Sequence, residues 1–350
     1  MARALALAWR GWGRVAPNPL VGAVVLRDGE VVGEGWHAEF GDRHAEPIAL
    51  AEAAGRARGA TLVVTLEPCA HQGKQPPCAD AVLAAGVRRV VAALADPNPR
   101  AQGGAARLRA AGVEVELGLM AAEAGRQNAA FVHAHRDARR PFVALKLATS
   151  LDGRIADAHG RSRWVSGPEA RAWVQWLRAG FDAIAVGAAT ACADDPSLTV
   201  RGEVTPRRAP LRVVVSRRGE LPASLGLVRT AREAPTVVLA TEAPSPAASG
   251  LAHHGVELLP AAGLAAGVEA LRARGVESVL VEGGGRLAGA LLEAGLVDRL
   301  YWIQAPLWLG ERGVPAVAGH AGTPLAEATR WQVVERRALG EDTLLVVDRS

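Results

Sequence analysis

Short β-rich runs alternate with helical segments along most of this chain, and this alternation restricts its fold more than any other feature. In the first part, the runs TLVVTL, RRVVAAL and VEVELG have the length and composition of strands, and CADAVLAAGV and AARLRAAG between them are helical. A second series begins with FVALKLATSLDG and continues through FDAIAVG, LRVVVS, APTVVLA, GVELLP and SVLVEGGG. Strands that alternate with helices are typical of a sheet covered by helices. The sequence therefore predicts an α/β fold.

A polar, Arg-rich stretch separates the two series. HAHRDARRP, residues 133–141, follows a helical segment, and the strand pattern restarts directly after it. We therefore place a domain boundary near Ala138, with a first domain over 1–138 and a second over 139–350. In the first domain, VGAVVLRDGEVVGEGW predicts a hairpin around its Asp-Gly pair, and AEPIALAEAAGRARG predicts a helix that stops at Gly59. In the second, residues 240–255 are small and polar and predict a surface loop.

The composition narrows the class of protein. Of the 350 residues, 49% are hydrophobic and 22% are charged, which is typical of a globular chain. We find no run of about 18 uncharged apolar residues and no signal-peptide pattern, so we expect no membrane span and a cytoplasmic location. Three cysteines in such a chain argue against a disulfide framework and leave metal binding or burial. We expect Cys192, which lies between alanines, to be buried.

The charge pattern bears on possible partners. The net charge is +4, and the cations are nearly all arginines scattered along the chain, so we expect no nucleic-acid partner. A mild positive balance suits an anionic substrate such as a sugar phosphate, and base composition explains it equally well. The chain has only two lysines, Lys74 and Lys146. Each is therefore a candidate for a site that needs a compact point charge.

One constellation of residues predicts a metal site. His44 and Glu46 open a helical segment, Cys69 follows a strand, and Cys78 begins the next helix. One imidazole and two thiolates make a three-ligand zinc site with an open fourth position for water, and a nearby Glu that is not a ligand can carry protons. His-x-Glu followed by Pro-Cys and a second Cys is the layout of the zinc deaminases. His71 is either a further ligand or a loop residue beside a substrate pocket.

The alternatives are a structural zinc, no metal, or a simple helix start at His44 and Glu46. The ordered combination with the EPC segment at a strand end favours the catalytic zinc site over all three.

The first half resembles a known family. The segments APNPLVGAVVLRDGEVVGEGWH, RHAE and VTLEPCAHQGKQPPCADAVLAAGVRRVVAALADPNP are similar to the deaminase domain of the bifunctional riboflavin-biosynthesis deaminase–reductases, over nearly all of residues 1–135. The long spacer between the cysteines, with GK and PPC, is the form found in that family. The resemblance implies a cytidine-deaminase-like three-layer α/β/α domain with zinc on His44, Cys69 and Cys78 and proton transfer by Glu46. It also implies substrate contacts from Asn18, His37, Lys74, Asp96 and Asn98, with Lys74 facing a phosphate.

Two observations qualify these assignments. Asn18 and Asn98 each lie in an Asn-Pro pair, which turn formation alone explains in part. Ala70 stands where the family commonly has Ser after the first Cys, so a side-chain hydrogen bond is missing at that position.

The second half contains VLVEGGGRLAGALL, which predicts a strand, a glycine turn and a helix whose first amides can bind an anion. The glycines do not form the G-x-G-x-x-G pattern of dinucleotide-binding folds. With VALKLATSLDGRIA and the segment around GRSRWVSGPEARAWVQW, this half resembles the reductase domain of the same family over most of 141–305. The resemblance implies a dihydrofolate-reductase-like α/β fold that binds NADPH.

The same resemblance implies specific contacts in the second half. The cofactor contacts are Ala148, Trp164, Thr190 and Asp194, with the phosphates held by Gly284, Gly285, Arg286, Leu287, Ala288, Gly289 and Ala290. The ribosyl contacts are Ser162, Arg178, Leu198, Arg201 and Glu282. Lys146 and Asp152, in the K-x-x-x-S-x-D-G segment, are expected beside the reacting sugar. Where the family has Asp-Ser after a strand, this chain has Ser216 and Arg217. Either Ser216 takes that NADP contact or Arg217 pairs with the 2′-phosphate.

Two of these residues, Trp164 and Asp194, have ordinary structural explanations. Trp164 is one of nine tryptophans and can be a core residue, and Asp194 and Asp195 before Pro196 can form a turn.

Together these features predict one chain with two active sites in series. The first would hydrolyse the 2-amino group of a phosphorylated 2,5-diamino-6-ribosylamino-pyrimidinone, and the second would reduce its ribosyl group to ribityl with NADPH. The family pattern implies a homo-oligomer, a dimer or a tetramer. One rival is a monofunctional zinc deaminase of a nucleobase or nucleic acid with a degenerate second domain. Another rival is a non-enzymatic, zinc-stabilised binding module. Such a module is expected to have lost Glu46 or Lys146, and the presence of both residues counts against it.

Overall fold

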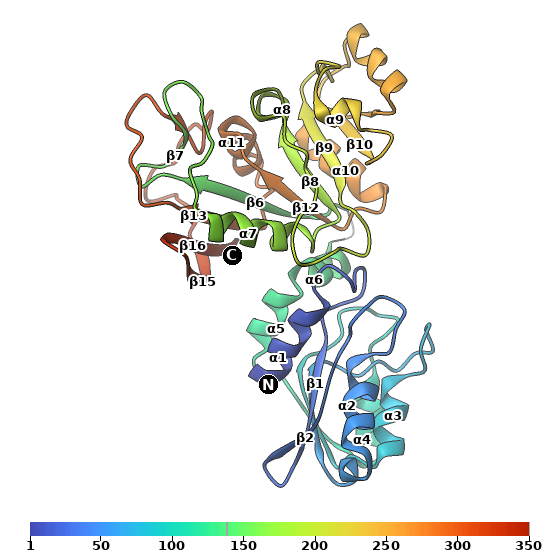
Figure 1. The fold of residues 1–350 in the computed structure, drawn as a ribbon. Helices are drawn as coiled ribbons and strands as arrows, with labels where there is room; N and C mark the ends of the chain where they lie inside the picture. Colours follow the sequence, from blue (N-terminus) through green and yellow to red (C-terminus); the bar gives the residue numbers. More distant parts are fainter. Residues whose placement is uncertain (138, 350) are drawn as a thin grey trace. The chain divides into compact units, whose positions relative to one another are not determined.

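A computed structural model describes residues 1–137 and 139–349 of the chain (Figure 1). It divides into two compact units, Met1–Asp137 and Ala138–Ser350. Ala138, where we placed the boundary, lies outside the described residues. In the described part, no helix is long and apolar enough to cross a membrane.

The first unit is built on a five-stranded sheet in the order β2-β1-β3-β4-β5. β1 pairs antiparallel with β2 and β3, and β3, β4 and β5 are parallel. The predicted hairpin is therefore confirmed as β1 and β2. The strands are β1 (Gly22–Arg27), β2 (Glu30–Trp36), β3 (Thr61–Leu66), β4 (Arg89–Leu94) and β5 (Glu114–Leu117). The helices are α1 (Ala2–Ala8), α2 (Ala45–Ala53), α3 (Cys78–Ala85), α4 (Gly104–Ala110), α5 (Ala121–Gln127) and α6 (Ala129–Arg136), with 3-10 turns η1 (Trp9–Gly11) and η2 (Ala54–Ala57).

Helices cover both faces of this sheet, with α1 and α5 on one face and α2, α3 and α4 on the other (Figure 1). Alternating strand residues explain the two layers, because successive side chains point to opposite faces. In β1, Ala23 and Val25 join the core under α2, whereas Val24 packs with Ala4 and Leu7 of α1. The first unit is thus a three-layer α/β/α domain.

Helix α2 lies unusually close to strand β2, and two glycines permit this approach. A Cβ on Gly33 would lie 2.2 Å from the Ala49 carbonyl oxygen, and one on Gly35 would lie 2.3 Å from that of Ala45. Any side chain at either position would push the helix away from the sheet. The close packing fixes where α2 begins, and His44 is the residue that precedes its first turn.

The second unit contains a nine-stranded sheet in the order β11-β10-β9-β8-β12-β6-β13-β16-β15. The strands from β11 to β13 are parallel, and β16 is antiparallel to β13 and β15. The strands are β6 (Phe142–Thr149), β8 (Ala183–Gly187), β9 (Leu211–Ser216), β10 (Thr236–Ala240), β11 (Glu257–Pro260), β12 (Ser278–Glu282), β13 (Arg299–Gln304), β15 (Trp331–Leu339) and β16 (Asp342–Arg349). A separate small sheet pairs β7 (Arg154–Ala156) with β14 (Val314–Pro315).

The helices of this unit are α7 (Pro168–Arg178), α8 (Ala188–Asp194), α9 (Gly226–Arg229), α10 (Leu264–Ala273) and α11 (Gly285–Glu293). Because β12 returns between β8 and β6, the carboxyl ends of these strands meet at one sheet edge where the chain order changes. Open α/β sheets bind ligands at such an edge.

Two expectations were wrong in detail. Residues 240–255 are not simply a surface loop, because Pro246–His254 form the 3-10 helix η3 and bury Ala248 and Leu251. Cys192 is exposed rather than buried, because α8 is a short helix that presents this side chain outward while Ala191 enters the core.

Candidate active sites

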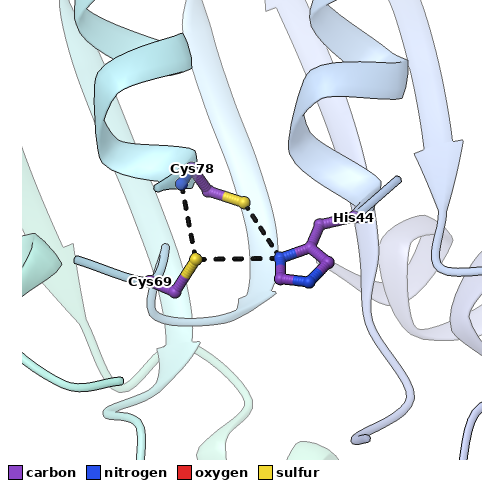
Figure 2. Close-up of side chains that lie close together, drawn as sticks. All are labelled: His44, Cys69 and Cys78. Atoms are coloured by element: carbon purple, nitrogen blue, oxygen red, sulfur yellow. Dashed lines mark hydrogen bonds between the residues drawn. The ribbon is translucent and has the colours of Figure 1, made fainter. Parts of the chain in front are cut away.

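The three predicted metal ligands come together in the first unit. His44 precedes α2, Cys69 follows β3, and Cys78 is the first residue of α3. The His44 Nδ1 atom lies 3.2 Å from the Cys78 sulfur and 3.7 Å from the Cys69 sulfur, and Figure 2 shows the three side chains pointing toward one another. A tetrahedral zinc with bonds of about 2.3 Å to sulfur and about 2.0 Å to nitrogen holds its ligands about 3.5 Å apart. The donor set and its spacing therefore fit zinc.

Backbone contacts hold the two cysteines independently of the loop between them. The Cys78 N–H donates to the Cys69 sulfur at 3.3 Å, and the Ala79 N–H donates to the Cys69 carbonyl at 3.2 Å. The hydrogen bond between the thiols lowers the pKa of Cys69 to about 4, and the same pairing raises the pKa of Cys78. Cys69 is thus a thiolate at neutral pH, which is the form that binds a metal.

Glu46 lies in the first turn of α2, the helix that His44 caps, and is buried. Its Oε2 atom has no hydrogen-bond partner among the residues that the structure describes. Burial raises the pKa of this carboxyl to about 7. A buried carboxyl group that has one unpartnered oxygen and can both take and give a proton near neutral pH has the properties of a general acid–base.

A cavity of about 280 Å³ opens beside these residues. It is lined by His44, Glu46 and Cys69 and by all five predicted substrate contacts, Asn18, His37, Lys74, Asp96 and Asn98. The structure thus brings this predicted set together around one space. The predicted substrate roles of these five residues stay predictions.

His37 and Asn18 are linked inside the cavity. The Asn18 Nδ2 atom lies 3.1 Å from the His37 Nε2 atom, and the other ring nitrogen lies 3.1 Å from the Arg43 carbonyl oxygen. Burial lowers the pKa of His37, so its ring is neutral. A neutral ring whose Nδ1–H donates to the carbonyl leaves Nε2 as an acceptor for Asn18. His37 therefore fixes the orientation of the Asn18 amide.

The loop between the cysteines carries the cation of this cavity. The Lys74 ammonium lies 4.0 Å from the centre of the Phe40 ring, and both residues line the cavity. His71 lines it as well and is not one of the three clustered metal ligands. The Gln75 side chain donates to the Gly41 carbonyl at 2.9 Å and attaches this loop to the segment before α2.

Sequence reasoning missed Glu67, which also lines the cavity. Its buried carboxylate accepts the backbone N–H of Asp96 at 3.1 Å through one oxygen, and those of Gly103 and Ala105 at 3.2 and 2.8 Å through the other. Glu67 therefore holds the loop that carries Asp96 and Asn98. The EPC segment contained the signal, because a carboxylate at a buried strand end requires partners.

In the second unit, Lys146 on β6 lies opposite Glu282 on β12 and Tyr301 on β13. Glu282 is buried and accepts two hydrogen bonds from Arg178, at 2.5 Å from Nε and 2.9 Å from Nη2. Burial alone would raise the pKa of Glu282, but the charge and hydrogen bonds of Arg178 and the charge of Lys146 together outweigh burial and lower the pKa. Burial lowers the pKa of Lys146. The predicted Lys146, Arg178 and Glu282 thus form one charged cluster at the sheet.

The glycine turn before α11 fits a phosphate group. A Cβ on Gly284 would lie 2.7 Å from the Thr190 hydroxyl oxygen, so only glycine permits this approach between α8 and α11. The first N–H groups of a helix lack intrahelical partners and attract anions. From Ala288 onward the N–H groups are used within the helix, since Ala288 donates to the Gly284 carbonyl at 3.0 Å. The first turn of the predicted Gly284–Ala290 segment is therefore the part that fits NADPH phosphates.

The remaining predicted cofactor and ribosyl contacts lie around this edge. The Ser162 hydroxyl donates to the Asp194 carboxylate at 3.0 Å, and the exposed Trp164 ring carries the Arg171 guanidinium at 4.7 Å. Ala148 lies on β6, two residues after Lys146, and Ser216 ends β9 and is buried. Arg201 is exposed, with its N–H bonded to Gln175.

Leu198 differs from these residues. Its side chain is fully buried in a core cluster, so a contact to a substrate can come only from its backbone. The pattern of the sequence did not distinguish these two forms of contact.

Asp152 lies in the turn between β6 and β7, where its carboxylate is fully engaged. It accepts the Ser150 hydroxyl at 2.6 Å, the Leu309 N–H at 3.1 Å and the Gly310 N–H at 2.7 Å. The Ser150 hydrogen bond is the main reason why the pKa of Asp152 is lowered. All three contacts are made within the protein, and the predicted catalytic role of Asp152 stays a prediction.

Comparison with known proteins covers the whole chain. The family model described as RibD C-terminal domain matches residues 141–345, more than half of the sequence. The chain belongs to the RibD family. A second model, the cytidine and deoxycytidylate deaminase zinc-binding region, matches residues 1–94, which include all three clustered ligands.

RibD relatives match from end to end. Riboflavin biosynthesis protein RibD of Escherichia coli is 42% identical, with 99% of this chain and 97% of the relative covered. That of Aquifex aeolicus is 39% identical, with 100% and 97% covered. Two solved structures each have a TM-score of 0.84 and cover 100% of this chain and 97% of their own. They are Acinetobacter baumannii RibD, at 36% identity, and the Thermotoga maritima diaminohydroxyphosphoribosylaminopyrimidine deaminase/5-amino-6-(5-phosphoribosylamino)uracil reductase, at 35%.

These matches confirm the predicted family and fold class. This chain has a cytidine-deaminase-like first domain with a zinc-binding region, followed by a RibD C-terminal domain of the dihydrofolate-reductase-like α/β type.

Proposed function

We propose that this chain catalyses two successive steps of riboflavin biosynthesis. Residues 1–138 would deaminate 2,5-diamino-6-(5-phosphoribosylamino)pyrimidin-4-one, and residues 139–350 would reduce the ribosyl side chain to ribityl with NADPH. The observation that carries the proposal is the buried, unpartnered carboxyl oxygen of Glu46 at a cavity where three zinc-type ligands converge, two of which, His44 and Cys69, line it. The membership in the RibD family supports both steps.

In the deamination, His44, Cys69 and Cys78 would hold zinc, which would lower the pKa of a water toward about 7 and so supply hydroxide at neutral pH. Glu46 takes a proton from the water as a C–O bond forms at ring carbon 2. It then returns protons to the amino group, the C–N bond breaks, and ammonia leaves. A carboxyl with a pKa of about 7 is suited to both transfers.

The cavity walls supply recognition in this proposal. Polar groups are presented to the pyrimidine by Asn18, which His37 holds in place. Asp96 and Asn98 present further polar groups, and Glu67 holds their loop. Lys74 enters from the loop between the cysteines and offers a compact charge to the substrate phosphate. The positions are held by hydrogen bonds to the protein, so the site is formed before substrate binds.

In the reduction, NADPH supplies a hydride, and the first turn of α11 would hold its phosphates. The hydride adds to the sugar carbon that bears the amine, the bond from this carbon to the ring oxygen breaks, and that oxygen takes a proton. Lys146 is the proposed proton donor, because it lies in the cluster with Glu282 and burial lowers its pKa. Arg178 holds Glu282 in place through two hydrogen bonds.

Both steps are tested on the purified, zinc-loaded chain. We expect one ammonia per diamino substrate, followed by oxidation of one NADPH. NADPH oxidation with the deaminated substrate but no ammonia from the diamino substrate would overturn the two-step proposal. Ammonia release without NADPH oxidation in either assay would favour a monofunctional deaminase instead.

We also propose a cytoplasmic location and a homodimer or homotetramer. Light scattering of the pure chain tests the assembly, and a monomer at working concentration would contradict it. Fractionation of cells that produce the chain tests the location, which recovery in the membrane or secreted fraction would contradict.

A further inference from the structure

A segment of the second unit joins the β6–β7 turn to the start of α11, and Asp152 fastens it. We call this segment, residues 305–318, the strap. It follows β13 and contains β14. Asp152 accepts the N–H groups of Leu309 and Gly310 in the strap, at 3.1 and 2.7 Å. The N–H of the adjacent Leu151 donates to the strap carbonyl of Leu307 at 2.9 Å. The turn and the strap are therefore bonded at several consecutive positions.

The far end of the strap supports α11. β14 pairs with β7, and the Ala316 N–H donates to the Gly153 carbonyl at 2.9 Å. The Ala318 N–H then donates to the Gly285 carbonyl at 2.9 Å. A Cβ on Gly285 would lie 2.2 Å from the Pro315 carbonyl oxygen, and one on Gly289 would lie 2.1 Å from that of Ala318. The strap backbone thus packs directly on the first two turns of α11.

We propose that Asp152 is a positioning residue for NADPH, which acts by holding the strap against the first turn of α11. This inference rests on the proposed function, in which that turn holds the cofactor phosphates. It replaces the role of Asp152 as a group that reacts with the sugar.

The engagement of the carboxylate supports positioning over proton transfer. One oxygen accepts the Ser150 hydroxyl and the Leu309 N–H, and the other accepts the Gly310 N–H. Ser150 is itself buried and its hydroxyl accepts the Arg154 N–H at 2.9 Å, so the donor cannot turn away at low cost. These bonds also keep the pKa of Asp152 below its usual value. A carboxylate that stays ionised and saturated has no proton to give.

A matched control exists on the same sheet. Asp182 accepts the same set of donors, the N–H groups of Glu277 and Ser278 and the Ser278 hydroxyl, at 3.0, 3.0 and 3.1 Å. It precedes β8, at the amino edge of the sheet, away from the strap. Asp152→Ala and Asp182→Ala therefore each leave two backbone N–H groups and one serine hydroxyl without an acceptor. Asp152→Asn keeps the shape of the side chain and loses one acceptor oxygen. It is included because the alanine variant could fail to fold.

The variants are compared by NADPH titration, monitored by nicotinamide fluorescence, and by their melting temperatures without cofactor. We expect Asp152→Ala and Asp152→Asn to raise the NADPH Kd about tenfold, which is about 1.4 kcal/mol. Asp182→Ala should lower the melting temperature and leave the Kd within about twofold of the parent. The pH profile of NADPH oxidation should have the same shape in Asp152→Asn as in the parent.

A Kd in Asp152→Asn within about twofold of the parent would overturn the positioning role. Loss of one limb of its pH profile would overturn it too, since Asp152 would then titrate in the reaction. If the parent chain does not bind NADPH, it is the proposed reductase function that fails, and the two failures are thereby distinguished.

Discussion

The Glu67→Gln variant tests whether the loop with Asp96 and Asn98 must be held for deamination. Glu67 accepts three backbone N–H groups, from Asp96, Gly103 and Ala105. A glutamine retains one oxygen and turns an NH₂ group toward at least one of these donors. One buried N–H without an acceptor costs about 1–3 kcal/mol. Transferred fully to substrate binding, this free energy raises the KM for deamination about 5- to 150-fold.

Ammonia release at varied substrate concentration measures this KM, and the zinc content is measured in parallel. We expect zinc to stay bound, because Glu67 contacts none of the three ligand side chains through the hydrogen bonds described above. NADPH oxidation with the deaminated substrate is an internal control and should be unchanged. Glu116→Gln, on the exposed β5 edge of the same unit, should match the parent in every assay. A KM for Glu67→Gln within about twofold of the parent, with zinc retained, refutes the reasoning.

Three further predictions follow from the two sites. Glu46→Gln should keep zinc but slow ammonia release about 10²- to 10⁴-fold, whereas Glu52→Gln on the same helix should not; normal deamination by Glu46→Gln would falsify the proton-carrier role. Removal of zinc by a chelator should abolish ammonia release and spare NADPH oxidation, and loss of both would contradict separate sites. Burial lowers the pKa of Lys146, so this side chain loses its proton at a pH below the usual 10.5, and the rate of NADPH oxidation should fall as pH rises through that range. Lys146→Arg should move this fall to higher pH. A fall at the same pH as in the parent would count against Lys146 as the proton donor.

The metal site was predictable because its chemistry lies in side-chain types and their order. His44, Glu46, Cys69 and Cys78 carry groups that have few other reasons to occur in this arrangement. The strands were predictable as well, because apolar runs of strand length alternate with helical segments, and the Asp-Gly pair marked the hairpin of β1 and β2.

The positioning roles of Glu67 and Asp152 were harder to predict from the sequence, for the same physical reason. The partners of both carboxylates are mostly backbone N–H groups, which every residue except proline carries. The residue types in the sequence therefore do not indicate which positions will bond to these carboxylates. For Leu198, the sequence does not reveal that the side chain enters the core, so it could not show whether a substrate contact would come from the side chain or from the backbone. The η3 turn was missed because small and polar residues are equally compatible with a loop and with a short 3-10 helix.

The backbone bonds between Cys69 and Cys78 make the intervening loop, residues 70–77, a replaceable part. The Cys78 and Ala79 N–H groups, which directly follow this loop, bond back to Cys69, which directly precedes it. Its length is therefore independent of the metal geometry, while its contents, including Lys74, form part of the cavity wall. The part of the cavity wall that carries Lys74 can therefore change without any adjustment of the three ligands or of Glu46 on α2. In this unit, one wall of the cavity is free to vary in evolution while the metal ligands stay in place.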